Sequence, residues 1–201
     1  MASGLEELGI IDDSDEHAAP APGATEQTAA IEDEAAAASD RAEQDAHLSK
    51  VEEILGAVRL FEGLLPTHLR RIAALARERE FGRGEHIFHH GDDGDGLYLV
   101  LEGAVRISRN VSGMGEEALA ILRAGQYFGE MSIVDDAPRS ADAIAHERSR
   151  VLKLPKDDLR DLMFVDRELA YELLWRFVRT MSGRLRESND RLLMLTISSK
   201  F

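Results

Sequence analysis

The feature that most constrains the fold is a series of short apolar runs between residues 81 and 155, separated by turn residues. The runs include "LYLVL", "AVRI", "ALAIL" and "RVLKL", and Gly and Asp occupy many of the positions between them. Strands of about five residues separated by such turn signals are typical of an antiparallel sandwich or barrel. The sequence therefore predicts a mainly β domain in this region, whose last strand ends at Pro155.

Helical periodicity flanks this β region on both sides. Residues 48–80 are predicted to be helical, because Ser49 and Glu52 have the spacing of a capping box and Pro66 suits the first turn of a second helix. After Pro155, helical spacing resumes and continues to about Ser198. We therefore expect N-terminal helices and a long C-terminal helix around the β domain.

Residues 1–47 have a different composition. They contain 13 acidic residues and one basic residue, with no aromatic residue and few apolar side chains. Such a segment cannot bury enough apolar surface to offset the entropy lost on ordering. We expect residues 1–47 to be an acidic disordered tail and residues 48–201 to be the folded domain. One apolar patch in the tail, "GLEELGII", is either a partner-binding helix or an incidental cluster.

Composition also narrows the function. The chain has no cysteine, which excludes disulfides and thiolate metal sites. No apolar run approaches the length of a membrane span, and no secretory signal is recognisable, so we expect a soluble, cytoplasmic protein. The net charge of −14 lies almost entirely in the tail, which leaves no basic face for nucleic acid. We see no nucleophile–base set and do not expect an enzyme.

The stretch "FGEMSIVDDAPRSADAIA", residues 128–145, carries the main candidate site. Glu130 and Arg139 lie nine residues apart in it. A guanidinium offers two parallel donors to a phosphate, and the N–H groups at a helix start also attract an anion. A carboxylate beside a phosphate needs hydrogen-bond donors, such as sugar hydroxyls. The pair therefore indicates a small molecule with a phosphate and hydroxyl groups, unless it is an ordinary surface ion pair.

The complete string resembles the phosphate-binding cassette of the cyclic-nucleotide-binding domain family. The matching residues are Phe128-Gly129-Glu130-Met131-Ser132 and Pro138-Arg139-Ser140-Ala141. The family includes the bacterial cAMP receptor transcription factors and the regulatory subunits of cAMP-dependent protein kinase. The resemblance covers about residues 50–195 and implies an eight-stranded antiparallel jelly-roll barrel that binds cAMP or cGMP and no metal.

The resemblance also implies roles for individual residues. Arg139 would bind the cyclic phosphate, and Glu130 would accept a hydrogen bond from the ribose 2′-hydroxyl. The remaining cassette positions would supply backbone or hydroxyl donors and line the site: Gly129, Met131, Ser132, Ser140 and Ala141. Asp142 stands where several relatives have Thr or Asn, and this departure from the family pattern concerns the contacts near the base.

Two other motifs have weaker claims to a function. In "HIFHHGD", His86, His89 and His90 could suggest a cupin-like metal site, but alternation along a strand would put neighbours on opposite faces. We expect surface histidines at a strand end. "GDDGDG" lacks the spacing and terminal glutamate of an EF-hand, and we expect a tight turn between strands.

The C-terminal helix has two apolar stripes. The first has the alternating spacing of a coiled-coil seam: Tyr171, Leu174, Val178, Met181, Leu185, Ser188, Leu192 and Leu195. The second, which comprises Leu169, Leu173 and Phe177, is available to pack on the β domain. Two stripes predict a homodimer, although one wide face on a single domain would give the same pattern. By resemblance to the cAMP receptor proteins, Ser188 and Asn189 would read the base.

Together these features predict a stand-alone cyclic-nucleotide sensor that regulates an unidentified protein partner through movement of its C-terminal helix. Because the chain ends after this helix, we expect no direct DNA binding. The alternative is a degenerate domain that binds no nucleotide and acts as a dimerising scaffold.

Overall fold

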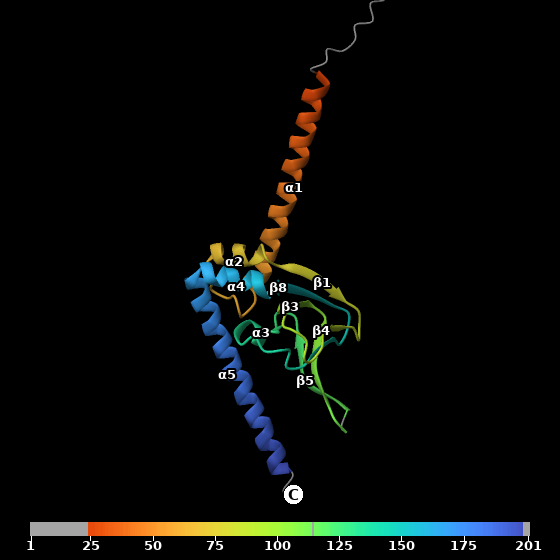
Figure 1. Ribbon diagram of the computed structural model, residues 1–201, viewed down its shortest axis with the longest axis vertical. Coiled ribbons are helices and arrows are strands. Elements are labelled where there is room, and N and C mark those ends of the chain that lie inside the picture. The colour runs from red at the N-terminus through yellow and green to blue at the C-terminus, as the bar shows by residue number, and fades with distance from the viewer. Residues whose placement is uncertain (1–23, 114, 199–201) are drawn as a thin grey trace, which may run out of the picture. The chain divides into compact units, whose positions relative to one another are not determined.

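The computed structural model describes residues 24–113 and 115–198 (Figure 1). The chain divides into two compact units after Gln44, and the second unit, residues 45–201, contains the β domain. Within the described part, no helix is both long and apolar enough to cross a membrane.

The first helix, α1 (Ala24–Gly56), covers residues for which we expected no regular structure. Its sequence is rich in Ala and Glu, which are strong helix formers. The apolar patch "GLEELGII" and the rest of residues 1–23 lie outside the described residues. The division into a disordered tail and a folded domain remains a prediction, but residues 24–47 are helical in this structure.

The boundaries of the N-terminal helices differ from the predicted ones. Ser49 does not cap a helix; it lies inside α1 and donates a hydrogen bond to the carbonyl oxygen of Asp45 at 2.9 Å. The second helix, α2 (Pro66–Ala73), begins at the proline as predicted but is only 8 residues long. Residues 77–80, predicted to be helical, belong instead to strand β1 (Arg77–Phe81). Backbone pairing with a neighbouring strand overrides the helix propensity of "RERE".

Eight strands form two four-stranded antiparallel sheets, which confirms the predicted jelly-roll class (Figure 1). In order across the first sheet the strands are β1 (Arg77–Phe81), β8 (Ser149–Pro155), β3 (Gly96–Glu102) and β6 (Tyr127–Phe128). In order across the second they are β2 (His86–Phe88), β7 (Asp142–Ala145), β4 (Ala104–Val111) and β5 (Gly115–Arg123). The sheets do not close into a complete barrel among the described strands.

The first sheet separates two apolar cores. Along β3, Leu97 and Leu99 belong to the cluster that includes the helices, whereas Tyr98 and Val100 belong to a second cluster with residues of the other sheet. This division follows from the alternation of side chains along a strand. Because β3 is buried on both faces, its position is strongly constrained, and the residues at its start are held in place.

Two helices follow the last strand, α4 (Lys156–Val165) and α5 (Arg167–Ser198). The stripe formed by Leu169, Leu173 and Phe177 is buried in the helical cluster, with each residue at most 1% exposed, as predicted. Farther along, α5 leaves the core, and its residues from Arg184 onward are exposed wherever their side chains are described. The buried beginning of α5 therefore anchors the helix to the β domain.

Candidate functional site

A cavity of about 1310 Å³ lies between the β domain and α5. Its walls come from β5, from residues 125–132 and 138–141, and from α5 residues between Trp175 and Arg191. Among the lining residues are seven arginines and three glutamates, and no lysine or aspartate. Although the whole chain has a net charge of −14, this cavity is therefore lined by an excess of positive charge, which favours an anionic ligand.

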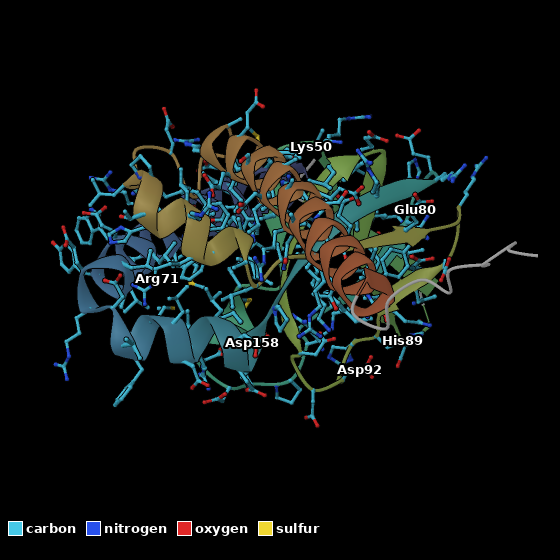
Figure 2. All side chains as sticks on the ribbon, turned by 90° about the horizontal axis from the view of Figure 1, so that it is seen from above. Lys50, Arg71, Glu80, His89, Asp92 and Asp158 are labelled. Carbon is cyan, nitrogen blue, oxygen red and sulfur yellow. The ribbon has the colours of Figure 1, made fainter. Side chains whose placement is uncertain are left out.

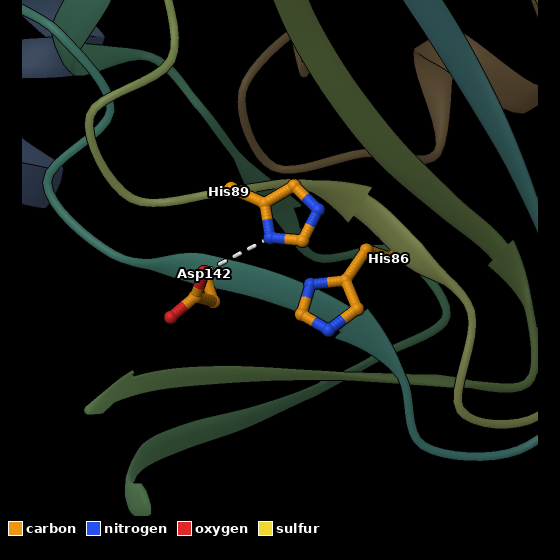
Figure 3. A group of neighbouring side chains, drawn as sticks. All are labelled: His86, His89 and Asp142. Atoms are coloured by element: carbon orange, nitrogen blue, oxygen red, sulfur yellow. Dashed lines mark ion pairs between the residues drawn. The ribbon is translucent and has the colours of Figure 1, made fainter.

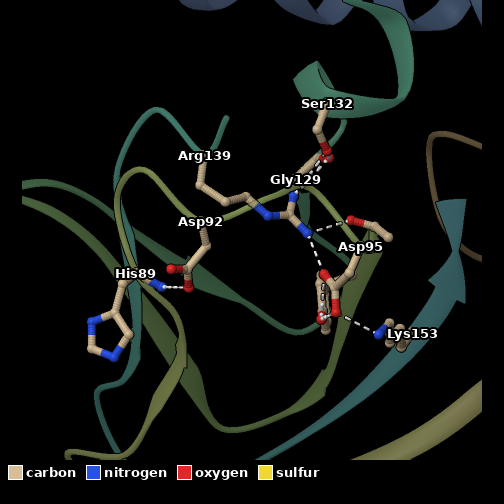
Figure 4. Close-up of polar contacts among 9 residues, drawn as sticks. His89, Asp92, Asp95, Gly129, Ser132, Arg139 and Lys153 are labelled. Atoms are coloured by element: carbon tan, nitrogen blue, oxygen red, sulfur yellow. Dashed lines mark hydrogen bonds and ion pairs between the residues drawn. The ribbon is translucent and has the colours of Figure 1, made fainter. Parts of the chain in front are cut away.

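Arg139 is the most constrained cation of the cavity, with only 4% of its surface exposed. Its Nη1 donates hydrogen bonds to the Gly129 carbonyl at 3.1 Å and to the Ser132 hydroxyl at 3.2 Å (Figure 4). Its Nη2 donates to Asp95 Oδ1 at 2.7 Å and to the Gly96 carbonyl at 2.8 Å. Its Nε is buried and has no hydrogen-bond partner within the described structure. A buried donor of this kind normally has a partner, so Nε is the one donor nitrogen of Arg139 that the described structure leaves unsatisfied.

The backbone around Arg139 explains two glycines of the sequence. Gly129 has a φ of +81°, and a Cβ there would lie 2.5 Å from Nη1 of Arg139. A Cβ on Gly94 would lie 2.0 Å from Cβ of Ser132, in the short helix α3 (Met131–Val134). A side chain at either position would displace the groups that surround the guanidinium.

The acidic turn before β3 is tied directly to the arginine segment. The Arg139 N–H donates to the carbonyl of Asp92 at 2.8 Å, and the Gly91 N–H donates to the carbonyl of Arg139 at 2.9 Å. Asp92 also accepts a hydrogen bond from the His89 N–H, and the two residues lie together at the surface (Figure 2). "GDDGDG" is a turn, as predicted, but one that positions a functional side chain.

Asp95, from the same turn, is a site residue that the sequence analysis missed. Its carboxylate accepts hydrogen bonds from Arg139, from Lys153 at 2.5 Å and from the Tyr98 hydroxyl at 3.0 Å. Partial burial alone would raise the pKa of Asp95, but the hydrogen bonds from Lys153 and Arg139 outweigh it and hold the pKa below its usual range. The carboxylate therefore stays charged and keeps the arginine in place.

Glu130 is the second nearly buried charge, with 2% of its surface exposed. Its carboxylate accepts a hydrogen bond from Nη1 of Arg184, which lies on α5. Nη2 of Arg184 donates to the carbonyl of Tyr127 at 2.9 Å. Arg184 was not predicted as a site residue, although it lies one turn before Ser188. It connects the cassette to the C-terminal helix.

Eight of the nine predicted site residues line the cavity. They are Gly129, Glu130, Met131, Ser132, Arg139, Ser140, Ala141 and Ser188. Asn189 is exposed and is not among the lining residues. Asp142 does not line the cavity either; its Oδ1 accepts a hydrogen bond from the His90 N–H at 3.0 Å. The difference from relatives that have Thr or Asn at position 142 therefore affects the surface beside β2, not the cavity wall.

Comparison with known proteins agrees with this geometry. Residues 78–166 match the model of the cyclic nucleotide-binding domain. A cyclic AMP receptor protein from Thermus thermophilus is 37% identical over 141 residues, which cover 68% of this chain and 62% of that protein. A cAMP-dependent protein kinase regulatory subunit from Mycosarcoma maydis is 34% identical over 94 residues, which cover 47% of this chain and 18% of the subunit.

One solved structure matches this chain over most of its own length. The cyclic nucleotide-binding domain from Methylobacillus flagellatus has a TM-score of 0.64 and 30% identity, and the match covers 74% of this chain and 84% of that chain. The chain therefore spans less than two thirds of each of the two regulators, but most of this solved domain. The matched residues include 128–141, where Glu130 and Arg139 lie.

Proposed function

Because the chain belongs to the cyclic nucleotide-binding domain family, we propose that its cavity binds cAMP or cGMP and that the protein is a regulatory sensor, not an enzyme. The observation that carries this proposal is the state of Arg139. It is a buried cation in a cavity lined mainly by positive charge, and its Nε has no partner in the part of the chain that the structure describes. A cyclic phosphate would supply that partner.

The other cassette residues have complementary roles. Glu130 repels a phosphate but can accept hydrogen bonds from ribose hydroxyls, and Arg184 orients its carboxylate. The Ser140 hydroxyl, which now lies 3.6 Å from the sulfur of Met131, is exposed and can turn toward the ligand. The backbone N–H of Ala141 is a further donor beside it. This arrangement recognises a phosphate and a sugar on one small molecule.

The contact between Glu130 and Arg184 also supports the regulatory part of the proposal. A ribose hydroxyl at Glu130 would share the carboxylate with Arg184, which lies on the exposed half of α5. Ligand binding would therefore change the forces on the C-terminal helix. Movement of that helix would then alter the contact with a protein partner. A ligand can shift such an equilibrium only through contacts that differ between the two states, and this hydrogen bond is one.

We further propose a homodimer through α5. Six of the eight expected seam residues are exposed in the single chain, notably Tyr171 at 66%, Leu185 at 63% and Leu192 at 62%. Apolar residues at heptad spacing are covered when two such helices pair. In this dimer, Ser188 and Asn189 would lie near the base of the nucleotide. That the chain does not bind DNA directly remains a prediction.

Titration calorimetry on the full chain tests the proposed function. We expect saturable binding of cAMP or cGMP and much weaker binding of 5′-AMP or 5′-GMP, each of which has the base and sugar of the corresponding cyclic nucleotide but an open phosphate. If the protein is instead a dimerising scaffold, sedimentation should show a dimer, and calorimetry should detect no binding heat from either cyclic nucleotide. That result would overturn the sensor and leave the fold unaffected.

A further inference from the structure

Three potential metal ligands meet on the surface beside the acidic turn. His86 comes from β2, His89 from the turn that follows, and Asp142 from the start of β7 (Figure 3). One ligand atom from each residue lies within 4.8 Å of the other two. The two imidazole rings stack with their centroids 4.1 Å apart, and Nδ1 of His89 lies 3.6 Å from Oδ1 of Asp142.

The sequence analysis expected surface histidines at a strand end, and His86 and His89 are exposed there. Its argument from strand alternation does not separate these two residues, however. Strand β2 ends at Phe88, so the alternation does not extend to His89. The pairing of β2 with β7 is also irregular between His86 and Phe88. The chain therefore turns back after Phe88 and brings the rings of His86 and His89 together.

We propose that His86, His89 and Asp142 bind a divalent transition metal ion, for which Zn²⁺ is the test ion. Two imidazoles and one carboxylate are a common ligand set for zinc. In a tetrahedral site with bonds of about 2.1 Å, ligand atoms lie about 3.4 Å apart. The pair formed by His89 and Asp142 is already near that separation. The side chain of His86 is exposed, and its ring would have to leave the stack with His89 to complete such a site.

Neighbouring contacts hold two of the three ligands. The carboxylate of Asp142 accepts the His90 N–H, and the His89 N–H donates to Oδ2 of Asp92 at 2.7 Å. Such supporting hydrogen bonds orient metal ligands and reduce the ordering required on binding. The ring of His90 is not part of the site, because its Nε2 lies 3.1 Å from Nη2 of Arg109. His90 is therefore a natural control.

The experiment titrates Zn²⁺ into the full chain after treatment with a chelator. We expect one ion per chain at this site. Loss of a residue that only supports a metal ligand typically lowers metal affinity about 10- to 100-fold. His86→Gln, His89→Gln and Asp142→Asn, which each remove a ligand, should therefore lower the Zn²⁺ affinity by at least this much. His90→Gln and His146→Gln, which remove histidines outside the cluster, should leave the affinity within about threefold of the parent.

Melting curves of all five variants report whether each one folds, and His86 and His89 are exposed, so their replacement should not prevent folding. The proposal is overturned if the parent binds no Zn²⁺ or if folded His86→Gln and Asp142→Asn keep the parent affinity. It is also overturned if His90→Gln loses as much affinity as they do. None of these outcomes depends on nucleotide binding, so failure of the metal site is distinguishable from failure of the proposed function.

Discussion

The two ends of the cavity differ in how completely the single chain builds them. At the cassette end, Glu130 and Arg139 are almost fully buried and each has charged partners. At the α5 end, Ser188 and Asn189 are exposed, and only Ser188 lines the cavity. One end is organised before the ligand arrives, whereas the other presents polar groups on a helix surface that the domain does not cover.

This difference indicates how recognition and response are divided. In the proposed function, the cassette end supplies the contacts to the phosphate and the sugar, and its two buried charges are already held by protein partners. The α5 end depends on what packs against it, which we propose is the ligand together with a second copy of the helix. Substitutions at the cassette end should therefore affect nucleotide affinity most, and those on α5 should affect both affinity and assembly.

The largest effect is expected for Arg139→Ala. Loss of one partner of a buried charge pair costs about 2–5 kcal/mol, which corresponds to roughly 30-fold to several-thousand-fold weaker nucleotide binding. Calorimetry measures the affinity. Arg148→Ala is the matched control, because Arg148 pairs with Glu80 at the exposed surface and should not affect binding. An Arg139→Ala variant within about threefold of the parent would refute the phosphate site.

A smaller effect is expected for Arg184→Met, which removes the contact between the cassette and α5. Hydrogen bonds to charged groups contribute about 1.5–3 kcal/mol, so nucleotide affinity should fall about 10- to 150-fold. Arg167→Met, on the same helix but not at the cavity, is the control. If Arg184→Met binds as tightly as the control, Glu130 does not need Arg184, and the proposed route to α5 is wrong.

Ser188→Leu should separate the two functions of α5. A leucine in the seam should strengthen dimerisation, whereas the loss of a polar contact with the base should weaken nucleotide binding by about 1–3 kcal/mol. Sedimentation measures the first effect and calorimetry the second. Asp190→Leu adds a similar side chain off the seam and serves as control. A tighter dimer with unchanged affinity would show that Ser188 belongs to the seam alone.

The smallest effect is expected from deletion of residues 1–44, the first compact unit. The deletion keeps Asp45, whose carboxylate pairs with Arg70 at 2.7 Å. Melting temperature and nucleotide affinity should both remain close to those of the full chain. Deletion of residues 1–47 also removes that ion pair, but such half-exposed pairs contribute at most about 1 kcal/mol. A large drop in melting temperature for either deletion would contradict the boundary.

Much of the site was predictable because its key residues are contiguous. Residues 128–141 carry the cassette in one short stretch, and its resemblance to a known pattern is independent of the surroundings. Asp95 and Arg184 were not predictable in the same way. Each contacts the cassette from more than 40 residues away, and an acidic turn or a helical arginine has no local feature that reveals such a contact.

By itself, the sequence determined the mainly β class and the position of the long C-terminal helix. It also determined the buried stripe of that helix, formed by Leu169, Leu173 and Phe177. All three features follow from local periodicity. Only the tertiary structure decided that residues 77–80 belong to a strand, since their helix propensity yields to pairing with β8. It also decided that Asp142 meets His86 and His89, because that contact depends on how β2 and β7 align. Periodicity reports which face of an element is apolar, whereas the partners of a polar side chain depend on long-range packing.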